Sequence, residues 1–268
     1  MLIMKLPEFF NRLFNIHTYY DTKRTVYFQV VEVYNNIAMC GRYGFSIKNA
    51  REVYDRFEIK NQSVDLKPHY NIAPGTMQPI VTKHSPNSLQ FMFWGLIPHW
   101  AKDTTMSYKT INARAEGIES KPTYKKPFRF QRCLIPATGF YEWDKSTKPS
   151  TPYYFHLKDE ALFAFAGLYD LWKDPKDGKE IYSYTIITTV PNDVVAPIHN
   201  RMPVILQKED EEFWLDPDVI EPERLLPLLH PYPSQEMTHH SVSTAVNKPR
   251  IDSEELIKPQ EEKNPKLL

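Results

Sequence analysis

Cysteine is scarce in this sequence, because its 268 residues include only Cys40 and Cys133. Two cysteines are too few for a disulfide framework, and no paired Cys/His spacing typical of a zinc site accompanies them. We therefore expect a protein of a reducing compartment, the cytoplasm, with no structural metal.

Long apolar runs, a glycine-rich loop and an excess of one charge are also missing. No uninterrupted apolar stretch approaches the about 18 residues of a membrane-spanning helix, so we expect no membrane contact. No glycine-rich phosphate loop and no alternating strand and helix units occur, which disfavours a nucleotide-binding parallel sheet and a nucleotide cofactor. The 33 basic residues balance the 33 acidic ones, so only a local patch could attract nucleic acid.

What the sequence does contain is enough apolar material for one large domain or two small ones, with 41% hydrophobic and 13% aromatic residues. Short runs rich in aromatic and β-branched residues, separated by prolines and polar clusters, predict strands. An Asp-Gly pair at 177–178 predicts a hairpin between two of these runs. The predicted strands are 77–82, 89–98, 132–143, 152–157, 162–172 and 181–190.

Helices are few and peripheral in this pattern. Apolar residues recur every three or four positions over 46–57, behind a capping serine at Ser46. The segments 208–215 and 222–229 also indicate short helices. These elements predict an α+β fold: a single domain with a mainly antiparallel, partly closed β-sheet core and peripheral helices.

The two ends of the chain differ from its middle. Residues 1–38 contain no glycine and no turn chemistry, so we interpret them as an extension outside a domain that spans 39–258. Their apolar start lacks a small-residue cleavage site and indicates either a short amphipathic helix or translated upstream sequence. Residues 259–268 are predicted to be a mobile tail.

The tetrapeptide Met39-Cys40-Gly41-Arg42 is the first candidate for chemistry. If the chain began at Cys40, its α-amine and thiol would form a 1,2-aminothiol. Such a group traps an aldehyde as an imine and then closes on it with sulfur to give a thiazolidine. Most lone cysteines are instead small buried residues, and that alternative stays open.

Four polar residues interrupt apolar sequence further along. Asn112 and Arg114 alternate in an extended segment and should share one face. Glu142 is flanked by aromatic residues, which predicts a raised pKa and a carboxyl that carries a proton near neutral pH. The alternative is a purely structural role, in which Glu142 pairs with a buried arginine such as Arg114. His199 lies in a proline-bounded loop and could be catalytic or structural.

A basic stretch between His99 and Arg132 accompanies these residues. It holds eight basic residues (Lys102, Lys109, Arg114, Lys121, Lys125, Lys126, Arg129, Arg132) and three acidic residues (Asp103, Glu116, Glu119), so its net charge is 8 − 3 = +5. Aromatic residues on the turns 93–95 and 98–100 lie just upstream. Cations for phosphates beside aromatic rings for stacking are typical of single-stranded nucleic-acid binding, but a solvated loop next to core aromatics would have the same composition.

Taken together, seven motifs follow the order found in the SRAP family, the SOS-response-associated peptidases understood as abasic-site-processing proteins. The chain resembles a bacterial member of that family over about residues 39–258. The motifs are 39–42, 70–75, 94–101, 111–116, 132–143, 165–169 and 198–203.

The resemblance implies roles for four residues in chemistry. Cys40 matches the N-terminal nucleophile that links to the aldehyde of an abasic deoxyribose. Asn112 matches the asparagine that holds the sugar or the crosslink. Glu142 matches the acid/base group beside the cysteine amine, and His199 matches the histidine that assists sugar opening and the imine steps.

The resemblance also implies DNA contacts. Arg42 and Arg114 match arginines that grip flanking phosphates, and Trp94 falls in the aromatic wedge that splays the strand. Asn71 and Thr188 match polar positions near the site. The extension is the departure from the family, because there the cysteine normally follows the initiator methionine.

The sequence therefore predicts a monomeric DNA-damage protein that crosslinks single-stranded DNA at abasic sites, without a cofactor, and associates with the nucleoid when bound to DNA. Self-processing peptidase activity and lyase activity are further expectations. Two alternatives remain at this point: a cysteine peptidase or amidohydrolase using Cys40, His199 and Glu142, and a non-covalent single-strand-binding module.

Overall fold

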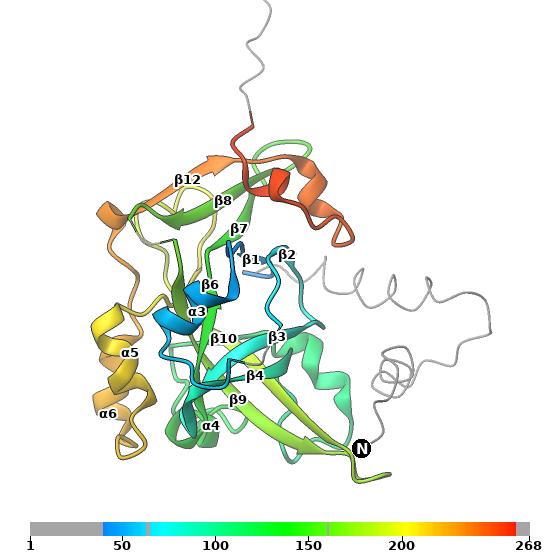
Figure 1. Ribbon diagram of the computed structural model, residues 1–268, viewed down its shortest axis with the longest axis vertical. Coiled ribbons are helices and arrows are strands. Elements are labelled where there is room, and N and C mark those ends of the chain that lie inside the picture. The colour runs from blue at the N-terminus through cyan, green and yellow to red at the C-terminus, as the bar shows by residue number, and fades with distance from the viewer. Residues whose placement is uncertain (1–39, 63–64, 160, 261–268) are drawn as a thin grey trace, which may run out of the picture.

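The computed structural model describes residues 40–62, 65–159 and 161–260 (Figure 1). The predicted extension and most of the predicted tail lie outside these residues. Within the described ranges, no helix has both the length and the apolar character needed to cross a membrane.

Seven strands form the larger sheet, and five of them close into a ring. The ring order is β10–β4–β3–β6–β9, and β9 pairs with β10 again, so no edge remains between these strands. The pairing of β10 with β4 is parallel, and the other four pairings of the ring are antiparallel. The bounds are β3 Met77–Thr82, β4 Ser85–Trp94, β6 Arg132–Ala137, β9 Phe163–Lys173 and β10 Glu180–Thr189.

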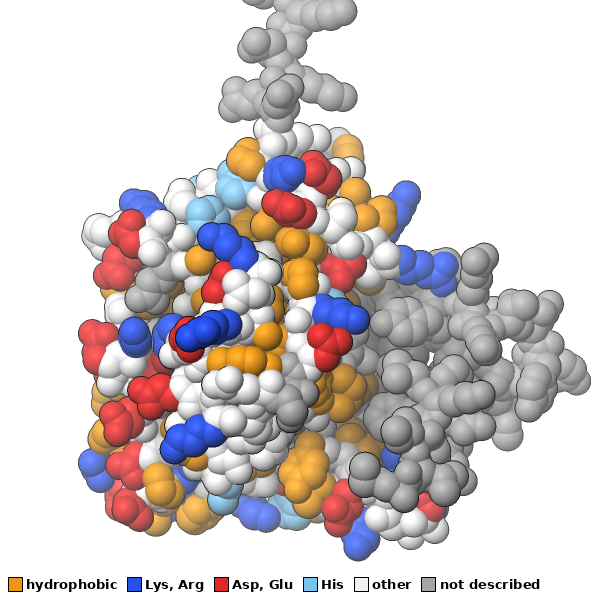
Figure 2. Space-filling model, in the orientation of Figure 1, with side chains coloured by type: hydrophobic (Ala, Val, Ile, Leu, Met, Phe, Trp, Pro, Cys, Tyr) orange, Lys and Arg blue, Asp and Glu red, His pale blue; other side chains and the backbone are white. Residues whose placement is uncertain are grey.

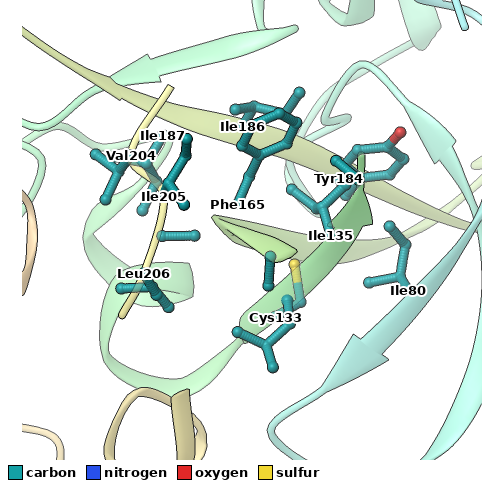
Figure 3. Packing of buried hydrophobic residues seen from close by; sticks show 14 of the residues in the cluster. Ile80, Cys133, Ile135, Phe165, Tyr184, Ile186, Ile187, Val204, Ile205 and Leu206 are labelled. Carbon is teal, nitrogen blue, oxygen red and sulfur yellow. The ribbon is translucent and has the colours of Figure 1, made fainter. Parts of the chain in front are cut away.

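Two short strands extend the ring along β10. Strand β5 (Asn112–Arg114) lies parallel to β10, and β11 (Met202–Pro203) lies antiparallel to its last residues. The predicted antiparallel, partly closed core is confirmed. Figure 3 shows its packing, in which Ile135, Phe165 and Tyr184 lie among the buried residues that fill the ring and the fully buried Cys133 is a core residue.

The smaller sheet has five antiparallel strands in the order β12-β8-β7-β1-β2. It continues directly from the ring, because only Thr138 separates β6 from β7 (Figure 1). The next residue, Gly139, could not carry a side chain, since a Cβ there would lie 2.3 Å from the Tyr154 ring. The bounds are β1 Tyr43–Phe45, β2 His69–Ile72, β7 Gly139–Asp144, β8 Thr151–Leu157 and β12 Met237–Ser241.

Short helices cover the outside of the two sheets, with α5 and α6 together on one flank (Figure 1). The α-helices are α3 Ala50–Arg56, α4 Lys125–Phe130, α5 Lys208–Leu215 and α6 Pro222–Leu225. The 3-10 helices are η1 Thr104–Lys109, η2 Leu226–Leu228, η3 Ser234–Glu236, η4 Thr244–Asn247 and η5 Glu254–Ile257.

Several boundaries differ from the sequence prediction, and three of the differences have a structural explanation. Helix α3 begins at Ala50 rather than near Ser46, because Asn49 is its cap: the Asn49 side chain accepts hydrogen bonds from the amides of Arg51 and Glu52. Strand β4 ends at Trp94 because Gly95 adopts a φ of 127°, where a Cβ would lie 2.7 Å from a backbone oxygen. The predicted strand 132–143 is two strands, one in each sheet.

Candidate nucleophile and nucleic-acid site

Cys40 lies where the two sheets meet, three residues before the start of β1. Its side chain is 3% exposed, and its backbone nitrogen donates to Glu142 Oε1 at 2.7 Å. Its Sγ lies 3.9 Å from the carbonyl oxygen of Arg201. Burial, reinforced by the negative charge of Glu142, raises the pKa of the Cys40 thiol, so the thiol keeps its proton at neutral pH.

Glu142 is a buried carboxyl on β7, with 4% of its surface exposed. The pairing of β7 with β1 fixes its position, because the Tyr141 amide donates to the Arg42 carbonyl. Burial raises the pKa of Glu142, and the nearby His199 partly opposes the shift. The predicted direction of the pKa shift is confirmed, and Glu142 can carry a proton close to the Cys40 nitrogen.

His199 lies in the loop that leads to β11 and approaches the same Glu142 oxygen as the Cys40 nitrogen does. Its Nδ1 is 3.7 Å from Glu142 Oε1 and 3.1 Å from the Arg201 carbonyl oxygen. The same Nδ1 lies 3.2 Å from the Arg201 amide nitrogen. A protonated ring would donate to the carbonyl, and a neutral ring with its proton on Nε2 would accept from the amide. Both protonation states therefore keep the ring beside Glu142.

Strand β5 brings Asn112 and Arg114 to the same region. The two residues alternate with the fully buried Ala113, so they share one face, as predicted. The register on β10 sets Arg114 opposite Thr188. Asn112 is half-buried and Arg114 is exposed, which places the arginine where a phosphate could reach it.

These contacts bring together a thiol, a backbone nitrogen, a buried carboxyl and a histidine. The set suits proton-assisted nucleophilic attack on a carbonyl carbon. Among the residues that the structure describes, no group of three or more His, Cys, Asp or Glu side chains could hold a metal ion. Both cysteines are free and buried.

Comparison with known proteins identifies the family of this chain. The family described as SOS response associated peptidase (SRAP) matches residues 39–249. The chain belongs to the SRAP family.

Named relatives of this SRAP chain come from bacteria and eukaryotes. The "Abasic site processing protein YoqW" of Bacillus subtilis is 44% identical over 223 residues, which cover 82% of this chain and 99% of that protein. The "Abasic site processing protein HMCES" of Xenopus tropicalis is 34% identical over 220 residues, which cover 70% of this chain and 65% of that protein. A crystal structure of a Bacteroides thetaiotaomicron protein aligns with a TM-score of 0.75 at 32% identity, covering 82% of this chain and all of that one.

The prediction that Trp94 is the exposed wedge is wrong for this SRAP domain. Trp94 is fully buried inside the ring, stacked on Tyr184, and its indole nitrogen donates to the Ile111 carbonyl. Trp94 is the last residue of β4 and points inward. The exposed tryptophan of the same motif is Trp100, which follows Pro98 outside the strand and is 50% exposed.

The structure also changes the assignment of three polar residues. Arg42 is buried and donates to Asn71 Oδ1 at 2.7 Å and to the Val246 carbonyl at 2.9 Å. The Asn71 amide donates to carbonyls of the segment 246–251. Arg42 and Asn71 therefore anchor the C-terminal segment instead of facing a phosphate. Thr188 is also fully buried, and its carbonyl accepts from Arg201 at 2.6 Å.

The basic stretch is less basic at the surface than its sequence suggests. Arg132 is fully buried, and its guanidinium donates to five backbone carbonyls around α4 and α5. Figure 2 shows acidic and basic side chains interspersed on the face that it draws, as expected for a neutral chain. The exposed cations of the stretch are Lys102, Lys109, Arg114, Lys125 and Lys126.

Sequence reasoning missed Glu116 and Arg201 as members of the site. Arg201 contributes its carbonyl to both Cys40 and His199, and its guanidinium forms a two-pronged ion pair with Glu116. Their positions could have indicated them, because Glu116 lies in the motif 111–116 beside Arg114 and Arg201 lies in the motif 198–203 beside His199.

Proposed function

We propose that this SRAP protein recognises abasic sites in single-stranded DNA and forms a covalent thiazolidine crosslink to them through Cys40. The observation that carries the proposal is the buried contact of 2.7 Å between the Cys40 nitrogen and the Glu142 carboxyl. A carboxyl with a raised pKa beside this nitrogen supports proton transfer to and from an attacking amine.

The proposed reaction has two bond-forming steps. The free α-amine of Cys40 attacks C1′ of the ring-opened sugar aldehyde, a C–N bond forms, and loss of water gives an imine. Glu142 supplies the proton that the departing hydroxyl needs. The Cys40 sulfur then adds to the imine carbon, a C–S bond forms, and the thiol proton passes by way of Glu142 to the nitrogen to give the thiazolidine.

His199 and Asn112 assist this chemistry in our proposal. His199, 3.7 Å from Glu142, exchanges protons with it while the sugar ring opens. Asn112 holds the sugar from β5. Arg114 contacts a phosphate, and Trp100, in place of Trp94, stacks on a base beside the lesion.

The chemistry requires that Cys40 be the first residue of the active protein. While a residue is attached to its nitrogen, that nitrogen is an amide and has no basic lone pair for attack on an aldehyde. We propose that residues 1–39 either result from a start assigned too early or are removed by the domain's own peptidase activity. The active domain, 39–258 in the sequence prediction, then acts as a monomer with slow or single turnover, in the cytoplasm and on the nucleoid when bound to DNA.

The imine also explains the expected lyase activity. An imine at C1′ promotes elimination of the 3′ phosphate unless sulfur traps it first. Because Cys40 Sγ and the Cys40 nitrogen belong to one residue, trapping should outcompete strand cleavage in the wild type.

A denaturing gel tests the proposal. A chain that begins at Cys40 is incubated with an abasic oligonucleotide and with an intact one of the same sequence. We expect a slow-migrating band only with the abasic strand, its loss in Cys40→Ser, and its retention in the matched control Cys133→Ala. An adduct that persists in Cys40→Ser would contradict the thiazolidine.

The rival assignments have their own signatures in this experiment. Release of peptides without a shifted band would favour a cysteine peptidase or amidohydrolase. Salt-sensitive binding to both strands without a denaturant-resistant band would favour a non-covalent binding module.

A further inference from the structure

We infer that Glu116 is a positioning residue for the crosslinking reaction: through Arg201 it holds the Cys40 thiol and His199 in their reactive arrangement. The inference rests on the proposed function and adds a residue to it. Glu116 itself would not touch the DNA sugar.

The contact between Glu116 and Arg201 is two-pronged. Arg201 Nη1 donates to Glu116 Oε1 at 2.6 Å, and Nη2 donates to Oε2 at 2.9 Å. The Arg201 side chain is 10% exposed, whereas that of Glu116 is 54% exposed. The hydrogen bonds from Arg201 lower the pKa of Glu116, so the pair stays charged at neutral pH. Paired parallel hydrogen bonds fix both distance and angle, which a single contact would not.

Arg201 transmits this constraint to the site through its main chain. Its carbonyl oxygen lies 3.9 Å from Cys40 Sγ and 3.1 Å from His199 Nδ1. Its amide nitrogen lies 3.2 Å from the same Nδ1. These two groups belong to the peptide units on either side of the Arg201 Cα, so a displacement of the Arg201 backbone would move the partner of the thiol and both partners of the imidazole.

The ion pair also ties the His199 loop to the strand that carries Asn112. Glu116 follows β5 by two residues, and the Ala115 amide and Arg201 Nη2 both donate to the Thr188 carbonyl on β10. The end of β5, the end of β10 and the loop before β11 are thus joined at one point. Each of the three segments supplies or adjoins a residue that the reaction uses.

A positioning role differs from a purely electrostatic one. Glu116 adds a negative charge near Arg114, which disfavours DNA binding. The two-pronged contact with Arg201 gives this carboxylate a geometric role in the free protein. Reacting groups that are displaced by about 1 Å lose on the order of 100-fold in rate.

The test compares Glu116→Gln with Glu119→Gln, a matched control that removes the same charge from the same turn. The described hydrogen bonds of the Arg201 guanidinium go to Glu116 and Thr188, none of them to Glu119. We measure the crosslinking rate constant at saturating abasic DNA and the Kd for an intact strand. We expect Glu116→Gln to lower the rate constant about 10-fold or more while the Kd stays equal or tightens. Glu119→Gln should leave the rate constant unchanged, and Glu116→Asp should restore part of the rate.

A second readout does not depend on DNA. Alkylation of Cys40 by a small thiol reagent should be several-fold faster in Glu116→Gln, because the Arg201 carbonyl beside the thiol is held less firmly. Cys133 in the core should react at an unchanged rate. Faster alkylation of both cysteines would indicate general loosening of the fold and overturn the positioning role.

The outcomes separate the two proposals. If the wild type forms the adduct and Glu116→Gln forms it at the same rate constant, the positioning role is wrong and the proposed function stands. If the wild type forms no adduct while the alkylation rates change as expected, the proposed function fails and the Glu116 contact remains a device that orders the cysteine. If neither readout changes, the positioning role fails by itself.

Discussion

Replacing Glu142 by glutamine separates catalysis from folding better than any other change in the site. Glutamine keeps the size of the side chain and an oxygen that can accept a hydrogen bond from the Cys40 nitrogen. In the wild type this nitrogen lies 2.7 Å from Glu142 Oε1. It removes the proton that the imine steps require. General acid–base catalysis contributes about 10²–10⁴ in rate. The crosslinking rate constant should fall by that factor, which corresponds to about 3–5 kcal/mol of transition-state stabilisation.

Stability should respond in the opposite direction. Burial raises the pKa of Glu142. A carboxyl with a raised folded-state pKa contributes stability that is fully present below its unfolded pKa, about 4.3, and is lost as pH rises through the folded value. Near neutral pH the raised pKa of Glu142 therefore lowers the free energy of unfolding, and Glu142→Gln should melt at the wild-type temperature or above it. At about pH 4 this advantage should disappear.

The assay is single-turnover crosslinking of a chain that begins at Cys40, followed on denaturing gels from pH 5 to 9, with thermal melts on the same samples. Glu180→Gln is the matched control, because it removes an exposed carboxyl from the far end of β10. A rate constant within about threefold of the wild type would refute the proton-transfer role, since acid–base groups contribute far more. A melting temperature that falls together with the rate would assign Glu142 to folding instead.

Three further changes test separate parts of the structure. Trp100→Ala should weaken binding to single-stranded DNA by about 1–3 kcal/mol in a fluorescence titration, with little change in Tm. Trp94→Ala should instead lower the free energy of unfolding by about 3–5 kcal/mol in denaturant titrations. The reverse pattern would assign the wedge to Trp94. Arg114→Ala should weaken binding to abasic and intact strands alike and reduce the slope of log K against log salt by about 1, and a loss confined to abasic DNA would make Arg114 part of the chemistry. Asn49→Ala should lower the free energy of unfolding by about 1 kcal/mol, because α3 loses its cap. Hydrogen exchange at the Arg51 and Glu52 amides should become faster in this variant and stay unchanged in Ser46→Ala.

The fold was predictable where local pattern and burial agree. Alternating apolar residues and aromatic runs located β3, β8, β9 and β10, because each of these strands has at least one face in the core. Closure of the ring was only partly predictable. The β9–β10 pairing follows from the local Asp177-Gly178 turn, whereas the parallel pairing of β10 with β4 joins strands that lie far apart in the sequence. The start of α3 was missed because Ser46 and Asn49 are both capping residues and only tertiary contacts choose between them: Ser46 bonds Thr138.

The candidate site was predictable for the residues whose type suggests chemistry, namely a cysteine, a carboxyl and a histidine. The proximity of Cys40, Glu142 and His199 agrees with the roles that the motifs imply. Trp94 and Arg42 could not be placed by sequence, because a tryptophan that ends a strand can face inward or outward and an arginine can bind a phosphate or a carbonyl. Arg201 contacts Cys40 and His199 through its main-chain oxygen, which residue type does not indicate.

The most direct measurement is the intact mass of the protein recovered from the crosslink. The full 268-residue chain is expressed, incubated with an abasic oligonucleotide, and the adduct is isolated under denaturing conditions and digested with nuclease. We predict a protein whose first residue is Cys40, with the sugar remnant on that residue. An adduct that retains all 268 residues would contradict the account, because a Cys40 nitrogen held in a peptide bond cannot form the imine.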